Sequence, residues 1–167
     1  MRKIFLAMTA AVMMLGVSGC GNTQEQTAEQ SAAEAVKERT TKAAPENNDL
    51  VIPVSEVSET AKFYPVTVEG TDMEVFAVKD SSGNIKTAFN TCQSCYTSGN
   101  GRYELEGTDL VCQNCGFHFT ADQIGQGANG GCSPWAISAD ERTDGEDTIT
   151  ISYDFLVSSN NIFANWK

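Results

Sequence analysis

Five of the six cysteines lie close together in the second half of the chain. Four of them form two Cys-x-x-Cys pairs, Cys92 with Cys95 and Cys112 with Cys115, and the fifth is Cys132. Each pair can direct two sulfurs at a common point, so two such pairs are typical of one site that holds a metal ion or an iron–sulfur centre. We predict that this site is the functional centre of the protein.

The spacing of the pairs does not by itself identify the metal. Soft thiolates suit an iron–sulfur cluster, zinc, mononuclear iron and copper(I). A zinc ribbon, in which four sulfurs close around a structural zinc ion and join two hairpins, is one alternative. Two disulfides are another, but they would close very small loops, and Cys132 would be left unpaired.

Three residues are expected to support the cysteines without binding the metal. Gly116 follows the second pair, where such a turn often needs a left-handed backbone. Gly131 allows the chain before Cys132 to approach the site closely, and Pro134 stiffens the chain after it. Cys132 is therefore predicted to cover the site or to be a fifth ligand.

His118 is the only histidine. If Phe117 and Phe119 face the core in a strand, His118 faces away, and we expect an exposed side chain that binds no metal.

The sequence shows no nucleophile with a paired base, no phosphate loop and no acid/base group that would support hydrolysis or group transfer. We therefore expect a carrier and not an enzyme. A thiol–disulfide oxidoreductase that uses one Cys-x-x-Cys pair is an alternative, although the βαβ context of such enzymes is missing.

The first residues resemble a bacterial lipoprotein signal. Residues 1–19 have a basic start, an apolar run too short to span a bilayer and small residues before Cys20. The resemblance implies that Cys20 is acylated and becomes the first residue of a protein held on the outer side of the cell membrane. A plain secretory peptide that leaves Cys20 as a free thiol is the alternative.

Composition predicts a tether after the signal and an acidic surface. Residues 20–49 contain few side chains that a core could bury, so we expect a disordered tether. The formal net charge of the chain is −11. Removal of the signal would also remove the positive charges of Arg2 and Lys3 and make the mature protein more acidic. This charge would repel nucleic acid, and it favours metal ions or a cationic partner.

Residues 50–167 are predicted to form one mostly β domain, with a small antiparallel sheet and a subdomain in which two cysteine turns hold the centre. Alternating apolar residues predict an antiparallel meander in the first half and a hairpin between the cysteine pairs. Both pairs then lie at strand ends. A helical turn and a late strand complete the domain. The expected strands, hairpin arms and helical turn cover residues 50–54, 63–68, 73–78, 85–90, 102–106, 109–111, 120–124 and 148–157.

The residues around the cysteines resemble the FtrD-like membrane iron–sulfur protein family. The likeness covers most of residues 50–137, and its motifs lie at residues 88–96, 101–103, 111–116 and 130–134. There is a more distant similarity to the cluster-binding loops of Rieske proteins, but cysteines replace the two histidine ligands.

The resemblance implies an extracytoplasmic domain that binds an iron–sulfur centre, with electron supply to iron uptake in some systems. It also implies that all five clustered cysteines are candidate ligands. We therefore expect a membrane-anchored protein that passes electrons to, or handles metal for, a transport or redox partner. A zinc-stabilised β domain that serves as a binding module is the main alternative.

Overall fold

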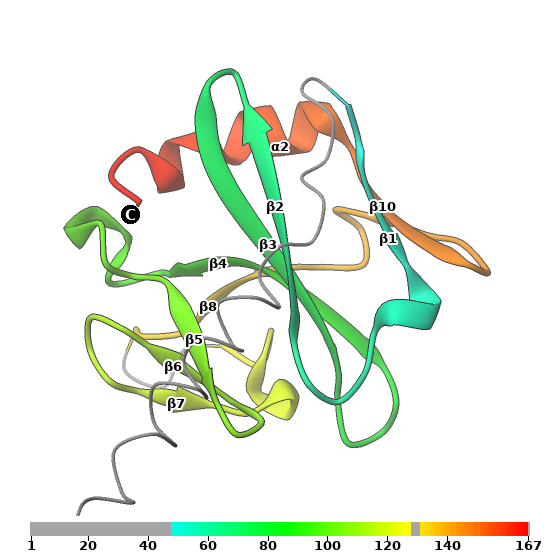
Figure 1. The fold of residues 1–167 in the computed structure, drawn as a ribbon, viewed down its shortest axis with the longest axis horizontal. Helices are drawn as coiled ribbons and strands as arrows, with labels where there is room; N and C mark the ends of the chain where they lie inside the picture. Colours follow the sequence, from blue (N-terminus) through cyan, green and yellow to red (C-terminus); the bar gives the residue numbers. More distant parts are fainter. Residues whose placement is uncertain (1–47, 128–130, 167) are drawn as a thin grey trace, which may run out of the picture.

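A four-stranded antiparallel sheet lies at the centre of the computed structural model, which describes residues 48–127 and 131–166 (Figure 1). Three consecutive strands and one later strand form this sheet. In spatial order they are β2 (Lys62–Val68), β3 (Thr71–Lys79), β4 (Ile85–Cys92) and β8 (Pro134–Ile137).

The turn between β2 and β3 is tighter than the sequence predicts. Only Glu69 and Gly70 separate the paired residues Val68 and Thr71. Both turn residues have positive φ, at 49° and 79°, as a two-residue hairpin turn that follows the natural twist of its strands requires. The predicted meander is therefore confirmed for these strands, with a shorter connection.

A second sheet pairs the beginning of the described chain with its end. It consists of β1 (Leu50–Pro53), β10 (Thr148–Ile151) and β9 (Thr143–Asp144), in that order. The prediction that β1 belongs to the first-half meander is wrong. The alternate residues Leu50 and Ile52 of β1 instead face Ile151 and Ile149 of β10 in the register.

The predicted late strand over residues 148–157 is also wrong in its second half. The strand ends at Ile151, and the Ser152 side chain accepts a hydrogen bond from the Phe155 N–H at 3.3 Å. This N-cap starts the helix α2 (Tyr153–Ser159). Leu156 of α2 is fully buried, and the 3₁₀ helix η4 (Asn160–Phe163) follows.

A third sheet carries the second cysteine pair. The predicted hairpin between the pairs is confirmed as β5 (Tyr103–Glu106) and β6 (Asp109–Cys112), and β7 (His118–Phe119) adds a short third strand. Figure 1 shows this sheet away from α2. The predicted helical turn is η3 (Ala121–Gln123). Two further 3₁₀ helices are η1 (Val54–Glu56) and η2 (Tyr96–Ser98).

The central sheet is covered by apolar side chains on both faces. Val75 and Phe89 pack with β1, β10 and α2 in one hydrophobic cluster. Phe76 and Ala88, on the other face, pack with the cysteines and the third sheet. The prediction of a mostly β fold with small antiparallel sheets is confirmed. The cysteine site is built on one face of a sheet that is buried on both.

The packing of α2 should be needed for stability. We expect Leu156→Ala to lower the free energy of unfolding by about 2–5 kcal/mol, because it empties space under a fully buried side chain. Urea unfolding followed by circular dichroism measures the change. Val51→Ala is the control, since Val51 is 52% exposed, and it should cost about 0.5 kcal/mol or less. Equal losses for both variants would contradict this description of the core.

Candidate metal centre

The sulfurs of the two Cys-x-x-Cys pairs converge on one point. The Sγ atoms of Cys92, Cys95, Cys112 and Cys115 all lie within 4.8 Å of one another, and we call these residues the cysteine group. Three of the four are buried, and Cys115 is half-buried. Strand β4 ends at Cys92 and β6 ends at Cys112, so both pairs lie at strand ends as predicted.

The first turn is held by backbone contacts to the segment before β5. The Cys92 N–H donates to the Gly101 carbonyl at 2.9 Å, and the Cys95 N–H donates to the Cys92 carbonyl at 3.1 Å. A Cβ at Gly101 would lie only 2.9 Å from the carbonyl carbon of Cys95. The close approach of these two segments therefore requires glycine at position 101.

The second turn has the left-handed residue that the sequence predicts. Gly116 has φ of 70°, and its N–H donates to the Cys112 carbonyl at 2.8 Å. The Cys112 N–H donates to the Phe117 carbonyl at 3.0 Å. The first turn needs no glycine after its second cysteine, because the chain continues from Tyr96 into η2.

The segment around Cys132 lies against the first turn. The Ser94 hydroxyl donates to the Gly131 carbonyl in a short hydrogen bond, and Gly131 has φ of 86°. The Gln93 N–H donates to the Ser133 carbonyl at 3.0 Å, and the Gln93 side chain donates to the Pro134 carbonyl at 3.3 Å. These bonds fix the segment beside the first pair of sulfurs.

Cys132 itself lies beside the cysteine group and is not one of its members. Its side chain is half-buried, and its thiol interacts with the thiol of Cys115. The backbone around Cys132 is hydrogen-bonded to the first cysteine turn, while the Cys132 sulfur contacts the Cys115 sulfur of the second turn. Its role as a ligand stays a prediction.

Burial makes three of these thiols hard to ionise. Loss of solvent raises the pKa of Cys95 and of Cys132 to about 12, and that of Cys112 to about 11. In the metal-free protein these groups are therefore neutral at pH 7. Because a metal binds the thiolate, metal binding at this site must release protons.

Cys92 is the exception. Burial alone would raise its pKa, but hydrogen bonds from the Tyr103 hydroxyl and from the N–H groups of Ser94 and Cys95 lower it below the ordinary value. The surroundings of Cys92 thus favour its thiolate, unlike those of Cys95 and Cys112. Burial raises the pKa of Tyr103, which is fully buried, and the contact with Cys92 raises it further.

The donor set fits a thiolate-bound metal. Four sulfurs point at one place, backbone N–H groups reach the most buried sulfur, and aromatic side chains exclude water from one side. Soft sulfur ligands favour iron, zinc or copper(I) over hard cations. The cysteines are therefore positioned to bind a metal ion or an iron–sulfur cluster.

His118 is exposed, as predicted, but the position of Phe117 differs from the prediction. The Phe117 side chain is 55% exposed and not in the core, because β7 begins only at His118 and Phe117 still belongs to the cysteine turn. Phe119 is buried. The His118 Nδ1 atom lies 3.4 Å from a carboxylate oxygen of Asp109 on β6.

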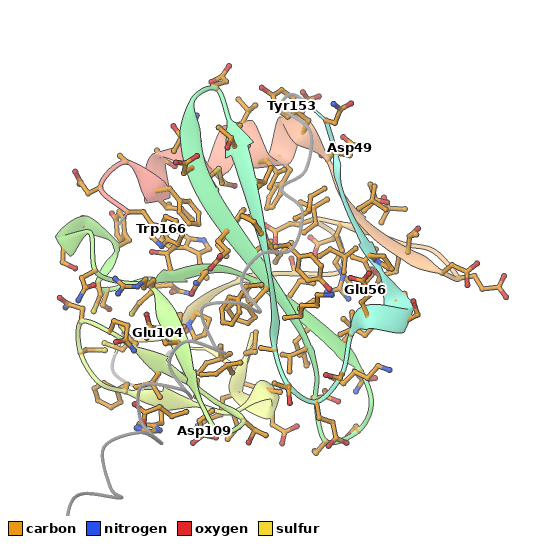
Figure 2. All side chains as sticks on the ribbon, in the orientation of Figure 1. Asp49, Glu56, Glu104, Asp109, Tyr153 and Trp166 are labelled. Atoms are coloured by element: carbon orange, nitrogen blue, oxygen red, sulfur yellow. The ribbon has the colours of Figure 1, made fainter. Side chains whose placement is uncertain are left out.

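Sequence reasoning missed a buried polar network beside the site. The Asn90 side chain accepts from the Tyr103 N–H at 2.7 Å and donates to the Glu74 carboxylate at 2.6 Å. The Asn90 carbonyl accepts from the Trp166 indole at 2.9 Å, and Figure 2 labels Trp166 near β4. A pattern of alternating apolar residues does not reveal such a polar residue. The one available signal was the position of Asn90, two residues before Cys92 in a buried strand.

Several predictions fall on residues that are not described. The signal over residues 1–19, the acylated Cys20 and the tether up to residue 47 lie outside the described residues, as does Gly130 of the resemblance motif. In the ranges 48–127 and 131–166 no helix has the length and apolar character needed to cross a membrane.

Comparison with known proteins supports the resemblance found in the sequence. A family described as membrane iron–sulfur containing protein, FtrD-like, matches residues 57–163. The match covers the whole cysteine group and Cys132. The family contains iron–sulfur and is membrane-associated. No curated protein and no solved structure matches the chain.

The left-handed backbone at Gly116 should matter for metal binding and not only for folding. We expect Gly116→Ala to strain the turn by about 1–2 kcal/mol and to weaken metal affinity about tenfold, since the strain is relieved by moving the cysteines beside it. Competition titration with a chelator measures the affinity.

Gly107 provides a matched control at the tip of the β5–β6 hairpin. Its φ is 65°, and a Cβ at either glycine would meet no atom within 4 Å. Gly107→Ala should therefore cost similar stability but leave metal affinity unchanged. If Gly116→Ala binds metal as tightly as the unaltered protein, the turn does not position the ligands as described.

Proposed function

The chain belongs to the FtrD-like family of membrane iron–sulfur containing proteins, and we propose that it is a lipid-anchored, extracytoplasmic electron carrier that serves a metal transport system. The observation that carries this proposal is the convergence of four cysteine sulfurs within 4.8 Å of one another. An iron centre held by these sulfurs would supply one-electron redox chemistry.

Burial favours a resident centre over a site that loads and unloads metal as cargo. Cys92 and Cys112 are 0% and 1% exposed, and both belong to the hydrophobic cluster under the third sheet. Release of metal would require protons to reach thiolates that are buried in an apolar environment. An electron, in contrast, can leave a buried centre without opening it.

The described residues would each have a simple role toward the centre. The cysteine group holds it, and the N–H groups of Ser94 and Cys95 with the Tyr103 hydroxyl stabilise the Cys92 thiolate. Hydrogen bonds to ligand sulfurs also tune the reduction potential of such centres. Cys115 is half-buried and is the member of the cysteine group most accessible from the surface.

The acidic surface supports a cationic partner. Carboxylates of Glu104, Glu106 and Asp109 are carried by the β5–β6 hairpin that delivers the second cysteine pair, and Figure 2 labels Glu104 and Asp109 on this part of the molecule. Opposite charge accelerates the encounter of redox partners and makes it sensitive to salt. A transport component with a basic surface therefore fits this carrier.

The redox role is tested on protein purified without oxygen. We expect visible absorption that bleaches on reduction and returns on reoxidation, because an iron–thiolate centre absorbs in both the visible and the near-ultraviolet. Metal analysis should give iron. A colourless protein with bound zinc would contradict the electron-carrier proposal and would support a structural zinc module.

Cys112→Ser is the matched variant for this experiment. It should lose most of the colour and metal, and it should loosen the third sheet, where Cys112 is buried opposite Tyr103 in the register. Full metal content in this variant would contradict the assignment of Cys112 as a ligand.

The membrane anchor has a separate test. We expect Cys20→Ser, expressed with its signal, to leave the membrane fraction for the soluble fraction, because acylation of this cysteine would be lost. Metal content per chain should stay the same, since the cysteine group alone supplies the four converging sulfurs on which the proposal rests. Fractionation followed by immunoblotting measures the change. Retention in the membrane fraction would contradict the lipid anchor.

A further inference from the structure

We infer that the centre is a single metal ion in a tetrahedral shell of four cysteine sulfurs, and that Cys132 lies outside this shell. The inference rests on the proposed function only in taking Cys92, Cys95, Cys112 and Cys115 as the ligands. It adds the number of metal ions that the site binds, and it identifies which of the five thiols is not a ligand.

The distances between the sulfurs carry the first step. A tetrahedral ion with metal–sulfur bonds of about 2.3 Å places its ligand sulfurs about 3.8 Å apart. In the structure every pair of Sγ atoms in the cysteine group lies within 4.8 Å. In a cluster with two or more irons, the cysteines bind to different irons. The distance between the irons then adds to the separation of the cysteine sulfurs, so these sulfurs lie farther apart than around one ion. The observed span fits one ion.

The backbone prevents the two turns from moving apart to make room for a cluster. Gly101 accepts a hydrogen bond from the Cys92 N–H at 2.9 Å, and the next residue, Arg102, accepts one from the Gln113 N–H at 2.9 Å. The two cysteine turns are thus tied to carbonyls of adjacent residues. Asn100, immediately before them, donates from its side chain to the Gln113 carbonyl at 3.0 Å.

Packing around the sulfurs supports the same conclusion. Cys92, Cys95 and Cys112 are buried in a hydrophobic cluster with Phe76 and Tyr103. Bridging sulfide atoms would add volume next to these buried side chains, and protein interiors tolerate added volume poorly. A lone ion between four sulfurs needs no such space.

Cys132 is surplus once the shell is complete. Four thiolates saturate a tetrahedral ion. The Cys132 thiol meets Cys115, which is the half-buried member of the group, while its own backbone is fixed to the first turn through Gly131 and Ser133. It therefore covers the exposed side of the centre without replacing one of the four ligands.

The test measures how much metal and sulfide each chain binds. The full-length chain is purified without oxygen, and one sample is offered ferrous iron with sulfide and another zinc alone. We expect one iron per chain with no acid-labile sulfide, and one zinc per chain in the zinc sample. X-ray absorption at the metal edge should show four sulfur neighbours at about 2.3 Å and no metal–metal distance.

Two or more irons per chain with acid-labile sulfide, or a resolved metal–metal distance, would overturn the inference. These outcomes are separable from failure of the proposed function. A chain that binds one zinc through four sulfurs but gives no reversible colour with iron supports the single-ion site and contradicts the electron-carrier role. A multi-iron cluster that bleaches reversibly contradicts the single-ion site and supports the electron-carrier role.

Two alanine variants assign the surplus thiol. Cys132→Ala should keep one metal ion per chain and four sulfur neighbours, whereas Cys115→Ala should bind at least tenfold more weakly and show three. If Cys115→Ala does not fold, the number of sulfur neighbours in Cys132→Ala still decides whether Cys132 is a ligand. A count of three there would place Cys132 in the shell and overturn the inference.

Discussion

The geometry of the centre depends on one short stretch of backbone. The carbonyls of Gly101 and Arg102, which are adjacent in the chain, accept hydrogen bonds from the first and the second cysteine turn respectively. Because Gly101 also packs against the carbonyl group of Cys95, no larger residue could hold the turns at this distance. The separation of the two pairs is therefore fixed by the fold before any metal binds, and this limits which metals the site can accept.

Burial of the sulfurs means that protons must leave when a metal binds. The ligand thiols of Cys95 and Cys112, with pKa values of about 12 and about 11, stay protonated at pH 7, so a metal must displace their protons to bind. Cys92 is different, since its hydrogen bonds already stabilise the thiolate. Binding of a metal to Cys95 and Cys112 therefore releases protons.

The sequence predicted the strands and the convergence of the cysteine pairs because both depend on local patterns. Period-two alternation identified β2 to β6, and the position of each Cys-x-x-Cys pair after a strand identified the site. Features that depend on contacts between distant parts of the chain, or on a single cap, could not be predicted from these local patterns. The partner of β1 is β10, nearly a hundred residues later, and α2 depends on the Ser152 cap interrupting an apolar run that alternation alone extends. Phe117 was misplaced because the cysteine turn displaces the start of β7 by one residue.

The central sheet joins the centre to the rest of the fold through Asn90. Its side chain binds the backbone of Tyr103 and the carboxylate of Glu74, and its carbonyl binds the indole of Trp166 after η4. A buried network of this kind is costly to leave partly satisfied, so a shift of β5 would also disturb β3 and the last described turn. The two hydrophobic clusters therefore share one rigid sheet. A centre held on such a support would change its ligand geometry little between oxidation states, as the proposed electron carrier requires.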